Sequence, residues 1–172
     1  MKYSVDSKLS ISFDCKDLAT GSPIQVIAEN NKGKTSTFVN QASRDIPNAM
    51  CIAEVEGNIS FKDMLDQYDL KTTDDSQAVK QVAESLMPSI NVDKPSNGGL
   101  ELLNVLSAAY CARNRPDCDY ICFDEALNSV ALDVRAKVYQ KLSELLNNKK
   151  VVYIDHAVSV DCRHATLQGN QF

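Results

Sequence analysis

Short apolar runs along the chain predict the strands of a folded domain. Residues 1–13 alternate apolar and polar side chains and lead to turn-forming residues at 19–23, which predicts an N-terminal β-hairpin. Short apolar runs predict four further strands, at 24–27, 49–55, 119–123 and 151–154.

Apolar residues at helical spacing lie between these runs. The strongest pattern, at 100–112, predicts a mostly buried helix, and at 134–146 the apolar residues share one face, with Arg135 expected elsewhere on the helix. Three more helical segments are predicted: one from Lys34 that ends before Pro47, a helical or irregular segment at 61–68, and one capped by Asp74, Asp75 and Ser76 that ends at Pro88. Strands that alternate with helices indicate a single α/β domain with a largely parallel sheet.

Composition and charge exclude several classes of protein. The chain has 172 residues, of which 44% are hydrophobic and 24% charged, with six glycines and five prolines, which excludes a largely disordered or collagen-like chain. A formal charge of −5 disfavours a broad contact with nucleic-acid phosphates. The apolar runs are much shorter than the roughly 18 to 20 residues of a membrane helix, and the N-terminus lacks the apolar segment of a secretory signal. We expect a cytoplasmic protein without membrane insertion of its own.

Residues 28–35 have the spacing of a phosphate-binding loop, with Ala28 where the first glycine usually stands. In such a loop backbone N–H groups surround the phosphates, the lysine reaches the terminal phosphates and the next hydroxyl binds Mg²⁺. The nucleotide-binding residues expected here are Asn30, Asn31, Lys32, Gly33, Lys34, Thr35 and Ser36. A polar turn that contains Gly-Lys-Thr is an equally good interpretation of the eight residues alone.

Two acidic residues, Asp124 and Glu125, follow the predicted strand at 119–123. The carboxyl ends of strands in an α/β sheet are where such folds bind ligands. One carboxylate there can hold Mg²⁺ and the next can orient or deprotonate an attacking water, which is the task of a phosphoryl-transfer site. Considered alone, the pair is also compatible with capping after a strand.

The order of motifs over residues 28–169 resembles the nucleotide-binding domain of ATP-binding-cassette (ABC) ATPases. The segments that carry the resemblance are the Walker A loop at 28–35, a signature loop at 96–99, the Walker B strand at 120–125, a D-loop at 131–133, the strand and switch histidine at 151–156 and a closing segment at 161–169. The resemblance implies the P-loop fold of this family, with a nucleotide-binding core at 1–56 and 119–172 and a helical subdomain at 57–118.

The resemblance also implies an ATPase in which two domains pair head to tail with ATP and Mg²⁺ between them. It makes Glu125 the catalytic base and His156 the residue that contacts the γ-phosphate and the attacking water. The implied magnesium ligands are Thr35, Asp124 and, at the place of the family's Q-loop glutamine, Glu54. Further nucleotide contacts are implied for Tyr3, whose ring would stack on adenine with Phe13 as the competitor, and for Ser96, Gly98, Gly99 and Asp133.

Departures from the family pattern predict slow or partner-dependent hydrolysis. Ala28 and Lys32 alter the glycine content of the Walker A loop, the signature reads Ser-Asn-Gly-Gly-Leu, and Ala126 follows the acidic pair where a proline is usual. A catalytically weak, nucleotide-dependent interaction module is therefore an alternative, and an α/β domain with coincidental motifs is another.

The partner is left open by the sequence. The protein is expected to pair with a second copy of itself or a paralogous ATPase, and to drive a membrane permease or a DNA-processing partner. A short interval from Lys34 to Glu54 disfavours the transporter class, whereas residues 57–95 lack the heptads of the coiled-coil arms found in the DNA-repair and chromosome class.

Overall fold

The computed structural model describes residues 3–5, 11–13, 18–27, 46–155, 157–158 and 160–166. The phosphate loop and the helix predicted after it lie outside these residues. The elements, in chain order, are β1 (Tyr3–Val5), β2 (Ile11–Phe13), β3 (Ile24–Ile27), β4 (Met50–Ile52), α2 (Phe61–Gln67), α3 (Thr73–Leu86), α4 (Asn97–Asn114), β5 (Tyr120–Asp124), α5 (Leu132–Leu145), β6 (Lys150–Ile154) and β7 (Arg163–Thr166).

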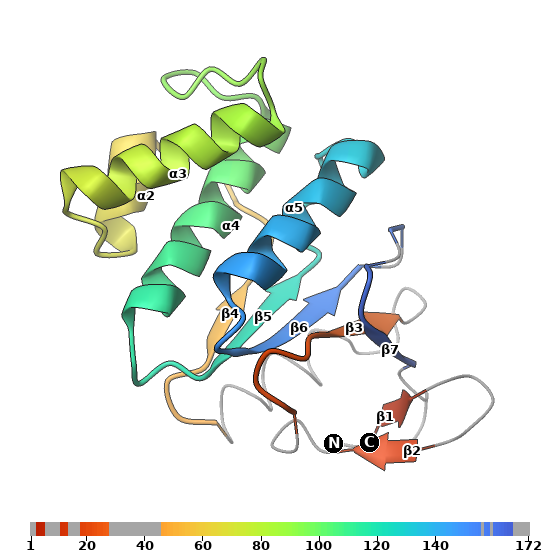
Figure 1. The fold of residues 1–172 in the computed structure, drawn as a ribbon. Helices are drawn as coiled ribbons and strands as arrows, with labels where there is room; N and C mark the ends of the chain where they lie inside the picture. The colour runs from red at the N-terminus through yellow and green to blue at the C-terminus, as the bar shows by residue number, and fades with distance from the viewer. Residues whose placement is uncertain are drawn as a thin grey trace.

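One sheet runs through the described residues in the order β2-β1-β7-β3-β6-β5-β4 (Figure 1). Strands β4, β5, β6, β3 and β7 pair in parallel, whereas β1 pairs antiparallel with both β7 and β2. The predicted α/β fold with a largely parallel sheet and an N-terminal hairpin is therefore confirmed.

The hairpin is not closed by the turn at 19–23. It consists of β1 and β2, in which Tyr3 pairs with Phe13. The chain after the turn forms β3, which pairs in parallel with β6 and β7 instead of returning along β2. Gly21 has a positive φ of 72°, and its N–H donates to the carbonyl of Lys149 at 3.0 Å, so this turn joins the entry of β3 to the segment before β6.

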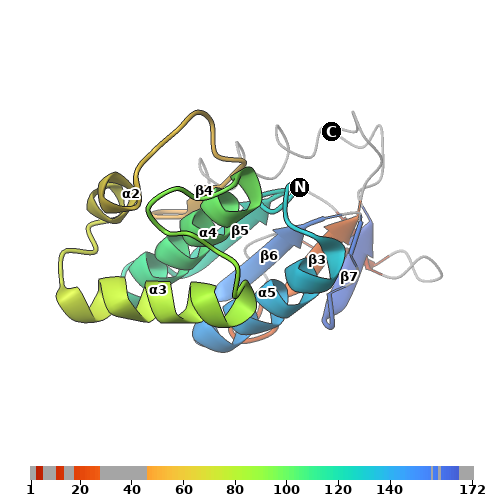
Figure 2. The ribbon, with the colours of Figure 1, turned by 90° about the horizontal axis from the view of Figure 1, so that it is seen from above.

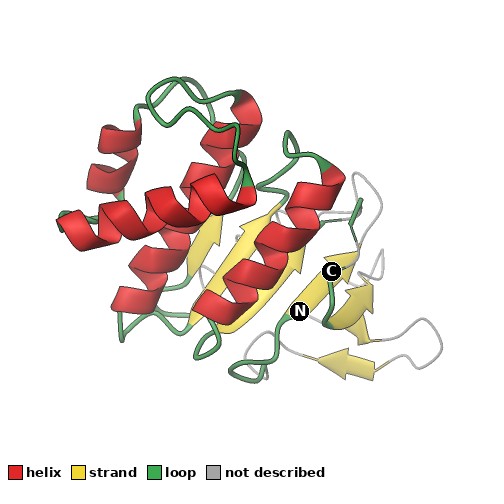
Figure 3. Ribbon diagram, turned by 45° about the horizontal axis from the view of Figure 1, so that its top comes forward, coloured by secondary structure: helices red, strands yellow, loops and turns green. Residues whose placement is uncertain are grey.

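The described helices cover one face of the sheet (Figures 2 and 3). Alternate residues of β5 point to opposite faces, because the side-chain period of a strand is two. Ile121 and Phe123 belong to the hydrophobic cluster beneath the helices, whereas Tyr120 and Cys122 belong to the cluster on the other face. Helix α4 lies between the strands and α3 in Figure 2 and is buried on all sides, as its apolar sequence predicts.

Side-chain caps set the starts of three helices. Ser60, Thr72 and Ser96 are the N-caps of α2, α3 and α4, and each side chain accepts a hydrogen bond from a backbone N–H three residues later. The prediction that Asp74, Asp75 and Ser76 cap α3 is wrong, because these residues lie within its first turns. The carboxylates of Asp74 and Asp75 there still complement the positive end of the helix.

The division into a nucleotide-binding core and a helical subdomain at 57–118 stays a prediction. Helices α2, α3 and α4 fall within 57–118, but they share one hydrophobic cluster with α5 and with strand residues of the core. Among the described helices, none is both long enough and apolar enough to cross a membrane.

Candidate functional site

The carboxyl ends of three neighbouring strands bring the predicted motifs to one edge of the sheet. Val26 of β3 is in register with Ile154 of β6, and Ile154 is in register with Asp124 of β5. Neighbouring strands lie about 4.8 Å apart, so the ends of β3 and β5 are separated by about 10 Å. The predicted phosphate loop begins two residues after Val26, and His156 stands two residues after Ile154. The chain therefore enters the loop, reaches the acidic pair and approaches the histidine at the same edge.

The acidic pair ends β5 in two different environments. Asp124 is only 6% exposed, whereas Glu125 is half-buried. Glu125 has a φ of 50°, in the left-handed region that non-glycine residues seldom adopt, and its N–H donates to the carbonyl of Ile154 at 2.9 Å. Strained backbone of this kind persists where surrounding contacts fix it, and it is concentrated at functional sites.

The signature-like residues form the start of α4 and pack against the segment that follows the acidic pair. Ser96 accepts a hydrogen bond from the N–H of Gly99 at 3.1 Å. A Cβ on Gly98 would lie 2.7 Å from the carbonyl oxygen of Ser129, so only glycine fits at this position. Gly98 and Gly99 are both buried.

Glu54 lies on the same side of the molecule as the start of α4. It lines a cavity of about 240 Å³ together with Asn97, Glu101 and Ser129, among others. Both carboxylate oxygens of Glu101 accept the N–H of Ser129 at 3.0 Å. Burial raises the pKa of Glu101, the hydrogen bonds from Ser129 oppose that rise, and the nearby charge of Glu54 adds to it. Glu54, the predicted Q-loop residue, and Glu101, a residue of the signature-like helix, therefore line the same cavity.

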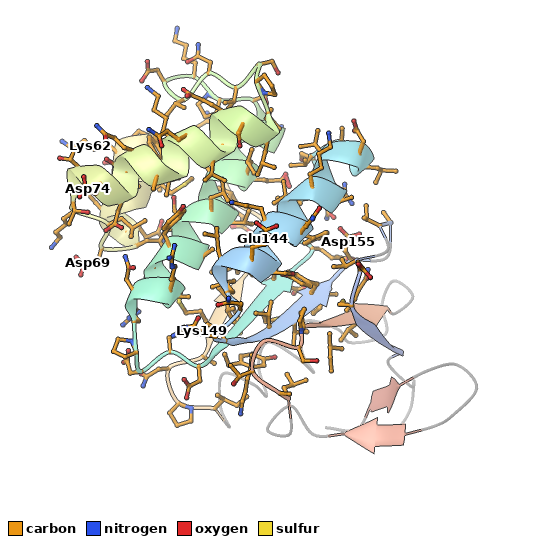
Figure 4. The ribbon with its side chains drawn as sticks, viewed as in Figure 1. Lys62, Asp69, Asp74, Glu144, Lys149 and Asp155 are labelled. Carbon is orange, nitrogen blue, oxygen red and sulfur yellow. The ribbon has the colours of Figure 1, made fainter. Side chains whose placement is uncertain are left out.

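Asp155, the residue directly before His156, follows β6 (Figure 4). A buried polar network surrounds its carboxylate. Its carboxylate pairs with the Arg135 guanidinium at 3.2 Å and accepts the Tyr139 hydroxyl at 2.6 Å. Burial, followed by the hydrogen bond to Asp155, raises the pKa of Tyr139 well above its usual range, so the phenol stays a proton donor. The Gln25 amide on β3 donates to the carbonyls of Asp155 and Val158. Strand β3 is therefore tied to the chain around residue 156.

Sequence reasoning did not identify this network. The expectation that Arg135 lies away from the apolar face of α5 is wrong, because its side chain is only 6% exposed. Arg135, Val138, Tyr139 and Leu142 are the buried residues of α5. Their spacing of i, i+3, i+4 and i+7 is that of one helix face, and this signal could have placed Arg135 inside.

Several of the remaining predicted site residues lie outside the part of the chain that the structure describes. Asn30, Asn31, Lys32, Gly33, Lys34, Thr35, Ser36 and His156 lie outside the described residues. The backbone of Tyr3 is part of β1, while its side chain and that of Phe13 are outside the description. Asp133 is exposed in the first turn of α5, next to Leu132, which is 54% exposed. Their roles toward a nucleotide stay predictions.

Solved structures share this fold, although the sequence matches no family model and no curated protein. A protein described as an ABC transporter ATP-binding protein from Pyrococcus furiosus is 16% identical, with a TM-score of 0.68 over 96% of this chain and 94% of its own. An inward-facing transporter described as of the metal-chelate ABC type is 16% identical, with a TM-score of 0.61 over 92% of this chain and 77% of its own. A bacterial Atm1-family ABC exporter with ATP bound is 12% identical, with a TM-score of 0.63 over 90% of this chain and 34% of its own.

These similarities define the class of the fold. The chain has the fold of the ATP-binding domains of ABC transporters, and the resemblance indicated by the order of motifs is confirmed at this level.

Proposed function

We propose that the protein is an ABC-type ATPase that binds Mg-ATP at the carboxyl edge of its parallel sheet and hydrolyses it. The observation that carries this proposal is the register of Val26, Ile154 and Asp124 across three adjacent strands. Unrelated motifs scattered along a chain would not be expected to end on neighbouring strands at one edge. The fold shared with ABC ATP-binding proteins supports the same conclusion.

The residues at this edge fit a magnesium nucleotide. Mg²⁺ in nucleotide sites is usually held by one or two protein oxygens together with phosphates and water. Asp124, a buried carboxylate at a strand end, supplies one such oxygen, and the Thr35 hydroxyl would supply the second. When bound, the metal neutralises charge on the phosphate oxygens.

The protein's own residues divide the remaining tasks. Lys34 and the backbone of 30–36 bind the phosphates, Glu125 takes a proton from the attacking water, and His156 orients that water and contacts the terminal phosphate. The hydrogen bond from the Glu125 N–H to Ile154 fixes the base relative to the strand that leads to His156. Glu54 completes the site at the place of the Q-loop residue.

We further propose that two copies, or one copy and a paralogous ATPase, enclose the nucleotide. Ser96, Gly98 and Gly99 at the start of α4 would face the partner's phosphates, and the exposed Leu132 and Asp133 would contact the partner near the site. The driven partner is a membrane permease or a DNA-processing protein, and the structural neighbours, which are described as ABC transporters, favour the permease. The cytoplasm is the compartment in which ATP is available to such a pair.

A catalytically weak interaction module is the second candidate. It is favoured by the burial of Gly98 against Ser129 and of Gly99 against Ile90, which leaves Ser96 and Asn97 as the exposed residues of the signature-like loop. In this alternative ATP controls assembly and turnover is negligible.

Binding of Mg-ATP to the wild-type protein tests the proposal. We expect saturable binding in a calorimetric titration, and weaker binding when EDTA removes Mg²⁺, because the phosphates would then lose their contact with the metal held by Asp124. Asp124→Asn is expected to lose the magnesium dependence, whereas Asp117→Asn, an exposed aspartate before β5, is expected to bind as the wild type does. Absence of ATP binding, or equal binding by wild type and Asp124→Asn at every magnesium concentration, would contradict the proposed site.

A further inference from the structure

The segment 128–130, which follows the acidic pair, is held by buried polar groups from two helices. Nη2 of Arg135 donates to the carbonyl oxygens of Asn128 at 3.0 Å and Val130 at 2.9 Å. The Glu101 carboxylate of α4 accepts the N–H of Ser129 in the same segment. Backbone N–H and carbonyl groups of this short segment therefore form hydrogen bonds with side chains of α4 and α5, so the position of the segment depends on both helices.

The same guanidinium reaches the chain next to His156. Its Nη1 donates to both carboxylate oxygens of Asp155, at 3.4 and 3.2 Å, and both side chains are almost completely buried. Oδ1 of Asp155 accepts the N–H of Ala157 at 2.8 Å and that of Val158 at 3.3 Å. The orientation of the Asp155 carboxylate consequently fixes the backbone on the far side of residue 156.

We propose that Arg135 is a positioning residue that couples segment 128–130 to Asp155 and thereby holds Glu125 and His156 in one geometry. The inference rests on the proposed function, in which these two residues act on the same water. The planar fork of an arginine can serve three acceptors at fixed angles, which a lysine cannot do. A buried ion pair often adds no more stability than apolar residues of the same size, so the proposal assigns this pair a role in positioning and not in stability.

The proposal extends to the start of α4. Glu101 and Gly98 both contact Ser129, so the signature-like helix terminus, segment 128–130 and Asp155 form one chain of contacts. A change at any of these points is transmitted to the backbone beside the catalytic groups.

Arg135→Lys tests the kinetic part of the proposal. The variant keeps the charge but loses the fork, and we expect kcat for ATP hydrolysis to fall at least about tenfold, because displacements near 1 Å in an active site cost rates of about 10²-fold. The KM for ATP is expected to stay within about twofold, since Lys34 and the backbone of 30–36, to which the proposed function assigns most of the phosphate contacts, are unchanged in sequence. Arg113→Lys, at an exposed arginine of α4, is the matched control and is expected to have the kcat of the wild type.

Ser143→Ala separates positioning from stability. It removes the hydrogen bonds that the half-buried Ser143 hydroxyl of α5 makes with the Tyr139 carbonyl and the Tyr153 hydroxyl, but it leaves the hydrogen bonds of Arg135 and Asp155 in place. We expect the thermal unfolding midpoint to fall, with kcat within about twofold of the wild type when assayed well below that midpoint. A loss of kcat in Ser143→Ala equal to that in Arg135→Lys, or no loss in either variant, would overturn the proposal.

Hydrogen exchange tests the coupling without any ATPase assay. In Asp155→Asn the carboxylate that faces Arg135 is neutralised, and the exchange rates of the Ser129 and Val130 amides are expected to rise at least about tenfold, although these amides donate to Glu101 and to the Leu127 carbonyl and not to Asp155. Amides within α3 should exchange as in the wild type, which excludes global unfolding. If Asp155→Asn does not fold, the exchange rates of the Ala157 and Val158 amides are measured in Arg135→Lys instead. These rates are also expected to rise at least about tenfold.

The ATPase assays and the hydrogen-exchange measurements together distinguish failure of the inference from failure of the proposed function. Absence of turnover in the wild type contradicts the proposed hydrolysis, and the exchange arm then decides the coupling by itself. Wild-type exchange at 128–130 in Asp155→Asn, or at 157–158 in Arg135→Lys, overturns the inference even if the wild type hydrolyses ATP.

Discussion

Glu125→Gln is expected to reduce ATP turnover by about 10² to 10⁴-fold, the usual contribution of a general base. The amide has the size of the carboxylate but cannot accept a proton from water. The half-buried position of Glu125 and its left-handed backbone at the end of β5 support its assignment as the base. Phosphate release at saturating Mg-ATP measures the effect.

ATP affinity is expected to survive this substitution, because the phosphates are bound by other residues. Retained ATP is also expected to stabilise the paired state, which light scattering at increasing protein concentration would detect. The matched control is Glu144→Gln, which alters an exposed glutamate of α5 that pairs with Lys141 at 3.5 Å (Figure 4). Equal turnover in the wild type and Glu125→Gln would remove Glu125 from the mechanism.

Lys34→Ala is expected to weaken Mg-ATP binding by about 10 to 150-fold, because a charge-assisted hydrogen bond to a phosphate contributes about 1.5 to 3 kcal/mol. The loss should appear in the equilibrium dissociation constant itself, since the lysine contacts the ground-state phosphates. A fluorescent ATP analogue or calorimetry provides the measurement.

The control for Lys34→Ala is Lys62→Ala, at an exposed lysine of α2 far from the carboxyl edge (Figure 4). It removes the same charge from the molecule without touching the proposed site. If both variants bind ATP with the affinity of the wild type, residues 28–35 are not a phosphate loop.

Local sequence patterns predicted the elements with strong apolar periodicity. Strands β5 and β6 begin and end within one residue of the predicted runs, and α4 extends the predicted helix at both ends. The partner of β3 could not be predicted in this way, because Val26 pairs with Ile154, which is far along the chain. A turn before a strand indicates a change of direction but not the strand that the chain will meet, so the turn at 19–23 by itself does not distinguish a hairpin from parallel pairing with a distant strand.

The candidate site was predictable where a motif follows a strand. Asp124 and Glu125 are at the carboxyl end of β5, as an acidic pair after an apolar run indicates. The contacts of Arg135 and Glu101 with segment 128–130 were not predictable, because they join residues on different elements and depend on helix packing. A charged residue at an apolar helix position is the sequence signal for such a contact, and it identifies the residue without identifying its partner.

Hydrogen exchange of the wild-type protein with and without Mg-ATP shows whether the nucleotide binds at the carboxyl edge of the parallel sheet. Slower exchange is expected on adding Mg-ATP in peptides that cover 28–36, 124–126 and 155–160, because these segments begin at or directly after the carboxyl ends of the neighbouring strands β3, β5 and β6. Protection confined to another part of the molecule, such as the cavity beside Tyr68 and Cys111, or no change at saturating Mg-ATP, would contradict binding at this edge.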